Sequence, residues 1–194
     1  ASDVYKRQGL FCAFDLAFLG ICSYNKINTL DAEGIIMNRY MTSLKGRAAS
    51  NPQKIVLPES GDLRILQAAD RILADGLAIP VLIGKRQDIQ ELALRYQLDL
   101  EGAELIYPKD HASFDRFAKE YARMRRVSGM TIEESRRFLR TPLYFGAFLV
   151  ASGEAAGMVA GLETPAPEVL HAALQIIGTR KGIDTVSSLS LIHI

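Results

Sequence analysis

Two arginines and one histidine are the side chains whose type and position could bind an anionic substrate. Arg64 follows the apolar run 55–57 and the capping candidate Asp62, so we expect it in the first turn of a helix. Unpaired backbone N–H groups in such a turn favour an anion, and a guanidinium can hold a phosphate through charge-assisted hydrogen bonds. Arg125 lies at the end of a long amphipathic segment, and His171 lies within a later helical segment.

A simpler interpretation stays open for each of them. Many surface arginines form exposed ion pairs that contribute about 0–1 kcal/mol, and Arg64 and Arg125 could be two of these. The basic run of Arg123, Arg125 and Arg126 is typical of a solvated helix face. A lone histidine on a helix, such as His171, is most often a partly exposed residue.

The sequence lacks the common motifs of cofactor-dependent and nucleophilic enzymes. It contains neither the G-x-G-x-x-G dinucleotide fingerprint nor the G-x-x-x-x-G-K-[ST] phosphate loop. It also lacks the H-E-x-x-H zinc motif and the G-x-S-x-G nucleophile elbow. With three histidines in the chain, and Cys12 and Cys22 both near the N-terminus, we expect no zinc site. These absences exclude the obvious cofactor classes.

The composition is that of an ordinary globular protein. Of the 194 residues, 48% are hydrophobic and 23% are charged, and the net charge is +1. This balance gives no indication of binding to nucleic acid or to an anionic membrane surface. The apolar segment 10–22 is too short to span a membrane and contains Asp15. The scarcity of cysteine favours a reducing compartment, so we expect a cytoplasmic protein.

A βαβ unit is predicted around Arg64. The apolar run 55–57 is typical of a strand buried on both faces, and the spacing of apolar residues predicts a helix over 63–73. Gly76 suits the position after a helix, and residues 80–83 predict a second strand. The fold class is therefore α/β with a mainly parallel sheet, and the turn after the first strand is where such folds bind ligands.

The rest of the chain continues this alternation. Phe117, Tyr121 and Met124 are predicted to face the core from a helix over 111–126, and Thr131 begins a capping box. The other predicted elements are helices over 87–96, 142–152 and 167–177 and strands over 104–106, 158–160 and 184–189.

Several separate blocks of sequence point to one family. They are KIVLPESGDLRILQAADRILADGLAIPVLIG, RRVSGMTIEES, YFGAFLVASGEAAGMVAG and ALQIIGTRKGIDTVSS. In this order and spacing, over residues 41–189, they resemble the phosphate acetyltransferase (phosphotransacetylase) family. The resemblance implies reversible transfer of an acetyl group between coenzyme A and phosphate, with coenzyme A as a substrate and with no metal or redox cofactor.

The resemblance also implies an architecture and a set of binding residues. The expected fold is a three-layer α/β/α domain of the isocitrate/isopropylmalate dehydrogenase-like kind, the first domain of a two-domain, homodimeric enzyme. Arg64 and Arg125 fall on family arginines that bind the anionic substrates. His171 stands where the family has a third such arginine, and it is shorter and only partly charged at neutral pH. The catalytic serine, arginine and aspartate of the family are expected downstream, so the catalytic residues are unknown here.

The domain boundaries follow from the same comparison. Residues 1–36 are interpreted as a non-native or disordered extension, because residues 1–8 look like translated adaptor sequence and Met37 and Met41 offer starts. Residues 37–183 are expected to form the incomplete first domain. Residues 184–194 are expected to begin the second domain and to end in a sequence artefact. We expect the fragment alone to be inactive.

Three other functions stay open at this point. A phosphate butyryltransferase-like enzyme would have a larger acyl pocket. A non-catalytic acyl-CoA-sensing domain, of the kind appended to malic enzymes, fits the change at His171. In an unrelated parallel α/β binding protein, Arg64 and Arg125 would be ordinary surface charges.

Overall fold

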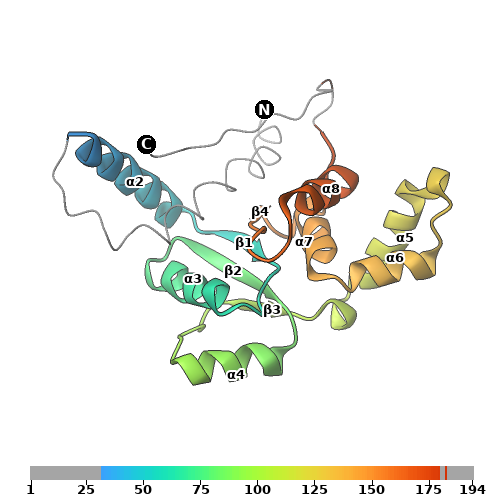
Figure 1. Ribbon diagram of the computed structural model, residues 1–194, viewed down its shortest axis with the longest axis horizontal. Helices are drawn as coiled ribbons and strands as arrows, with labels where there is room; N and C mark the ends of the chain where they lie inside the picture. Colours follow the sequence, from blue (N-terminus) through green and yellow to red (C-terminus); the bar gives the residue numbers. More distant parts are fainter. Residues whose placement is uncertain (1–31, 180–181, 183–194) are drawn as a thin grey trace.

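The computed structural model describes residues 32–179 and 182, and these residues build a parallel sheet between two layers of helices (Figure 1). The strand order is β3-β2-β1-β4, and every neighbouring pair is parallel. The strands are β1 (Gln53–Leu57), β2 (Ala78–Ile83), β3 (Glu104–Ile106) and β4 (Gly157–Met158). The predicted α/β class and the parallel sheet are confirmed.

Helices connect the strands and cover both faces of the sheet. In Figure 1, α3 and α4 lie on one side of the sheet, and α7 and α8 lie on the other, with α5 and α6 beyond them. The α-helices are α2 (Ala32–Ser50), α3 (Leu63–Ala74), α4 (Arg86–Tyr96), α5 (Phe114–Met124), α6 (Ile132–Leu139), α7 (Pro142–Ala151) and α8 (Ala166–Ile176). Two short 3₁₀ helices are η1 (Pro108–Asp110) and η2 (Arg126–Ser128).

The three layers follow from the alternation of side chains along each strand. Val56 and Val81 belong to the larger hydrophobic cluster, which α5, α6, α7 and α8 complete. Leu57 and Leu82, the next residues along, belong to a separate cluster with Leu66 of α3 and residues of α4. Since successive side chains of a strand point to opposite faces, the central strands are buried on both sides. The predicted three-layer arrangement is confirmed.

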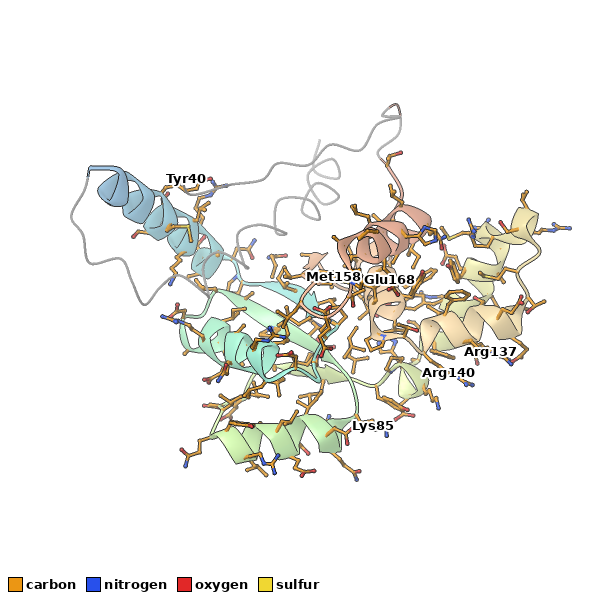
Figure 2. All side chains as sticks on the ribbon, in the orientation of Figure 1. Tyr40, Lys85, Arg137, Arg140, Met158 and Glu168 are labelled. Carbon is orange, nitrogen blue, oxygen red and sulfur yellow. The ribbon has the colours of Figure 1, made fainter. Side chains whose placement is uncertain are left out.

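Helix α7 packs very close to the sheet because Gly146 has no side chain. A Cβ atom at this position would lie 2.9 Å from Cγ1 of Val56, 3.0 Å from Sδ of Met158 and 3.3 Å from Cδ1 of Ile83. Met158, labelled in Figure 2, is the last residue of β4. The close approach therefore seats α7 directly on the three strands β1, β2 and β4.

Most residues predicted to begin or end a helix do so in the structure. The Asp62 side chain caps α3 by accepting a hydrogen bond from the backbone N–H of Arg64, and Gly76 has a φ of +63° just after the helix. Thr131 and Glu134 form both hydrogen bonds of the predicted capping box at the start of α6. Ser60, two residues before the Asp62 cap, is buried, and its hydroxyl donates to the Leu57 carbonyl and accepts from the Ile83 N–H.

Some expectations differ from the structure or lie outside the described residues. Met124 was predicted to face the core and is 42% exposed, because it is the last residue of α5, where the chain turns into η2. Helix α2 spans Ala32–Ser50, so the boundary proposed at residue 37 falls within this helix, and the division into domains stays a prediction. The predicted strand over 184–189 lies outside the described residues. No helix within residues 32–179 is both long and apolar enough to cross a membrane.

Candidate functional site

The carboxyl ends of β1 and β4 bring two distant turns together. Ile55 of β1 pairs with Gly157, and Val56 pairs with Met158, in parallel register. The turn after β1 therefore lies beside residues 161–164, which follow β4 and lead into α8. This edge of a parallel sheet is where open α/β folds bind ligands.

The carboxylate of Glu59, in the turn after β1, binds the backbone of this neighbouring turn. It accepts hydrogen bonds from the N–H groups of Gly161 at 3.1 Å, Leu162 at 2.8 Å, Glu163 at 3.0 Å and Thr164 at 2.7 Å. The residue is only 8% exposed. A buried carboxylate is costly unless it is hydrogen-bonded, and these donors satisfy both of its oxygens.

The pKa of Glu59 reflects this environment. Burial alone would raise the pKa of the carboxyl, but hydrogen bonds from the backbone of Thr164, Leu162 and Glu163 outweigh burial and lower the pKa below 4.5. Donors that bind the charged form favour it over the neutral form. Glu59 is therefore an ionised group within the protein at neutral pH.

Arg64 lies in the first turn of α3, as predicted. Its guanidinium forms two hydrogen bonds with Asp62, from Nε to Oδ1 at 3.0 Å and from Nη2 to Oδ2 at 2.7 Å. The hydrogen bond from the Arg64 side chain is the main cause that lowers the pKa of the Asp62 carboxyl. The arginine side chain is 61% exposed, so its guanidinium remains open to solvent within this ion pair.

Arg125 ends α5 with a partly buried side chain. Its Nε atom is buried and has no hydrogen-bond partner among the described residues. The positive charge lies near the phenols of Tyr121 and Tyr144. Burial raises the pKa of Tyr121 to about 12, and the charge of Arg125 opposes that rise. A buried guanidinium nitrogen without an acceptor is unusual in a folded protein.

His171 lies exposed on α8 and is linked to α5 by a chain of contacts. Its Nε2 atom contacts Nε2 of Gln175, one turn further along α8. Oε1 of Gln175 accepts a 2.5 Å hydrogen bond from the hydroxyl of Tyr121. Tyr121 precedes Arg125 by one turn, and the Arg125 N–H donates to the Tyr121 carbonyl. The structure thus connects His171 to Arg125, whereas Arg64 belongs to a helix on the other face of the sheet.

Three residues of this region were not among the sequence candidates. Tyr121 was predicted only as a core residue, and Gln175 was not singled out. Glu59 carried a usable signal, because an acidic residue directly after a buried strand falls at the ligand-binding edge of a parallel sheet. Its partners lie more than a hundred residues away, and the sequence gives no sign of that pairing.

A known protein family matches most of this chain. The family model described as phosphate acetyl/butaryl transferase matches residues 39–194. A phosphate acetyltransferase of Acetivibrio thermocellus is 40% identical over 149 residues, which are 77% of this chain and 44% of that protein. The chain thus spans less than half the length of this relative.

Solved structures agree with the sequence relatives. The EutD phosphotransacetylase from Staphylococcus aureus matches with a TM-score of 0.69 and 32% identity, over 77% of this chain and 45% of that one. A phosphotransacetylase from Streptococcus pyogenes matches with a TM-score of 0.71 and 30% identity, over 76% of this chain and 45% of that one. The predicted family is confirmed: the chain belongs to the phosphate acetyl/butaryl transferase family.

Proposed function

We propose that the protein containing this chain catalyses the reversible reaction of acetyl-CoA with phosphate to give acetyl phosphate and CoA. The observation that carries this proposal is the family match over residues 39–194. Acetyl is proposed over butyryl because the Acetivibrio thermocellus relative is named phosphate acetyltransferase and the two similar structures are named phosphotransacetylase.

The chemistry requires charge neutralisation more than a cofactor. In the direction of acetyl-CoA synthesis, the thiolate sulfur of CoA attacks the carbonyl carbon of acetyl phosphate. A C–S bond forms, the bond between the carbonyl carbon and the bridging oxygen breaks, and phosphate leaves with that oxygen and the electron pair. Both substrates are anions, so catalysis depends on holding them together and on offsetting their charge.

The binding residues proposed for this chain are Arg64, Arg125 and His171. The buried Nε atom of Arg125, which has no acceptor among the described residues, supports its assignment as an anion-binding group. The exposed Arg64 guanidinium can bind a substrate phosphate while its ion pair with Asp62 orients it. His171 supplies a weaker contact, since a neutral imidazole carries no charge.

The remaining features of the proposal rest on the family. We infer a two-domain enzyme with a dehydrogenase-like arrangement that acts as a homodimer in the cytoplasm. Its substrates are CoA, acetyl phosphate and phosphate, and it requires neither a metal nor a redox cofactor. The residues that deprotonate the CoA thiol are not assigned to this chain.

The test is CoA binding and turnover in the full-length protein with Arg64→Ala and Arg125→Ala. Loss of one charge-assisted contact costs about 1.5–3 kcal/mol, so each change should weaken CoA or phosphate binding roughly 10- to 150-fold. Arg123→Ala is the matched control, because Arg123 is an exposed arginine in the last turn of α5.

The possible results separate the candidate functions. Unchanged affinity for CoA when Arg64→Ala and Arg125→Ala are combined would favour an unrelated α/β protein with ordinary surface arginines. Tight CoA binding without formation of acetyl-CoA from acetyl phosphate would favour a non-catalytic acyl-CoA-sensing domain. Faster turnover of butyryl phosphate than of acetyl phosphate would favour the butyryltransferase.

A further inference from the structure

Glu59 is the one buried carboxylate among the described residues that joins the two turns at the carboxyl edge of the sheet. On one side, the turn after β1 continues into α3 and Arg64. On the other side, residues 161–164 continue into α8 and His171. The carboxylate therefore lies between the two segments that carry candidate substrate-binding residues on different faces of the sheet.

The contact has the form of an anion-binding nest whose anion is a side chain of the protein. Four consecutive backbone N–H groups, those of residues 161–164, converge on the two oxygens of Glu59 at distances between 2.7 and 3.3 Å. Successive N–H groups that point to one place commonly bind phosphates or other anions. Here they are occupied by Glu59, so the turn has a fixed shape before any substrate binds.

We propose that Glu59 is a positioning residue for acyl transfer: it locks residues 161–164 and thereby sets the spacing between Arg64 and His171. This inference rests on the proposed function. Glu59 acts through the turn and makes no contact with substrate in the proposal. Its ionised carboxylate also keeps substrate phosphates out of the nest, which would otherwise offer them a second, unproductive place to bind.

The kinetic test uses the full-length enzyme with Glu59→Gln, which keeps the size of the side chain and places an NH₂ group among N–H donors. Glu163→Gln is the matched control, since Glu163 is an exposed carboxylate on the same turn and its side chain is not part of the nest. Both variants are assayed well below their unfolding temperatures, with circular dichroism confirming the fold.

We expect Glu59→Gln to raise the KM for CoA or acetyl phosphate about tenfold or more, and Glu163→Gln to stay within about twofold of the native enzyme. A Glu59→Gln enzyme that is folded, melts earlier and keeps both kcat and KM would overturn the positioning role. That result would leave Glu59 as a purely structural group.

A second measurement does not depend on activity and uses Glu59→Ala, which is first shown to be folded by circular dichroism and places no NH₂ group among the N–H donors. Amide hydrogen exchange at residues 161–164 is followed in the native protein and in Glu59→Ala, with and without sodium acetate. We expect exchange to be about 100-fold faster in Glu59→Ala and to slow when acetate fills the nest, with sodium chloride giving no such slowing. Equal exchange rates at residues 161–164 in the two proteins would show that Glu59 does not hold this turn in place.

The two measurements separate this inference from the proposed function. If the native enzyme transfers no acetyl group, the proposed function fails, and with it the role of Glu59 in positioning substrates. The exchange result still decides whether the carboxylate holds the turn. If the native enzyme is active and Glu59→Gln is folded with native kinetics, only the positioning role fails.

Discussion

The hydroxyl of Tyr121 donates a 2.5 Å hydrogen bond to Oε1 of Gln175, and this bond ties α5 to α8. Arg125 lies one turn beyond Tyr121, and His171 lies one turn before Gln175. Two residues proposed to bind anions are thus carried by helices that hold each other in place. A binding site built on packed helices is more rigid than one built on loops.

Removing the Tyr121 hydroxyl should destabilise the protein and loosen this link. Tyr121→Phe leaves the Oε1 atom of Gln175 without its donor, and we expect a loss of about 1 kcal/mol in the free energy of unfolding. Urea denaturation measures this difference. Tyr40→Phe is the control, because Tyr40 is exposed on α2, well away from α5 (Figure 2). Equal effects of the two changes would contradict the role of the hydrogen bond.

Placing an arginine at position 171 should strengthen substrate binding. His171→Arg adds a permanent charge and paired donors at a proposed anion-binding position, so we expect CoA or phosphate to bind about tenfold more tightly. Isothermal titration of the full-length protein measures this. Leu170→Arg places the same charge on the neighbouring, partly exposed residue of α8. If both variants gain equally, the effect is general attraction and position 171 has no special role.

The contribution of Glu59 to stability should depend on pH in a defined direction. Its pKa is lowered in the folded protein, so the ionised carboxylate stabilises the fold above the ordinary value of 4.5. This contribution is lost as the pH falls through the lowered pKa. At neutral pH we expect Glu59→Gln to be less stable by about 1.5–3 kcal/mol, the scale of a hydrogen bond to a charged group.

Urea denaturation of the native protein and of Glu59→Gln at acidic pH values measures this pH dependence. The difference in the free energy of unfolding between the native protein and Glu59→Gln should become smaller below pH 4.5. A gap that stays constant as the carboxylate is protonated would mean that the negative charge contributes nothing to stability.

Two glycines in helices should respond to alanine in opposite directions. Gly146→Ala forces a methyl group against Val56 and Met158, and we expect a loss of about 1–3 kcal/mol from overpacking. Gly46 of α2 has no atom within 4 Å of the added methyl group. Gly46→Ala should therefore gain about 0.5–1 kcal/mol from helix propensity. Thermal denaturation distinguishes the two, and a Gly146→Ala protein as stable as the native protein would contradict the close packing of α7 on the sheet.

The parts of the fold that were predictable are those encoded by neighbouring residues. The strand, helix and strand around Arg64 follow from apolar spacing, and the capping box at Thr131 requires only Glu134 three positions later. The apolar spacing and the capping box each involve only residues that are close in the sequence. The prediction for Met124 was wrong for a related reason. Apolar periodicity indicates which side of a helix is buried, but it does not show that α5 ends at Met124.

The parts that were not predictable depend on contacts between distant residues. Glu59 and Thr164 meet only because β1 and β4 are neighbours in the sheet. Tyr121 was expected in the core, but its partner Gln175 could be found only once α5 and α8 were placed. Arg64 and Arg125 were predicted from helix ends, and neither the ion pair of Arg64 nor the buried Nε of Arg125 follows from spacing.

The strand order has a consequence for how the chain folds during synthesis. β1 can pair with β2 as soon as α3 closes the short connection between them, but Gly157 must be made before β4 can pair with Ile55. Long-range pairing of this kind forms slowly. Until then, one edge of β1 has no partner strand, and an apolar unpaired edge invites association with other chains. We therefore expect β1 to be the segment of the nascent chain most in need of a chaperone.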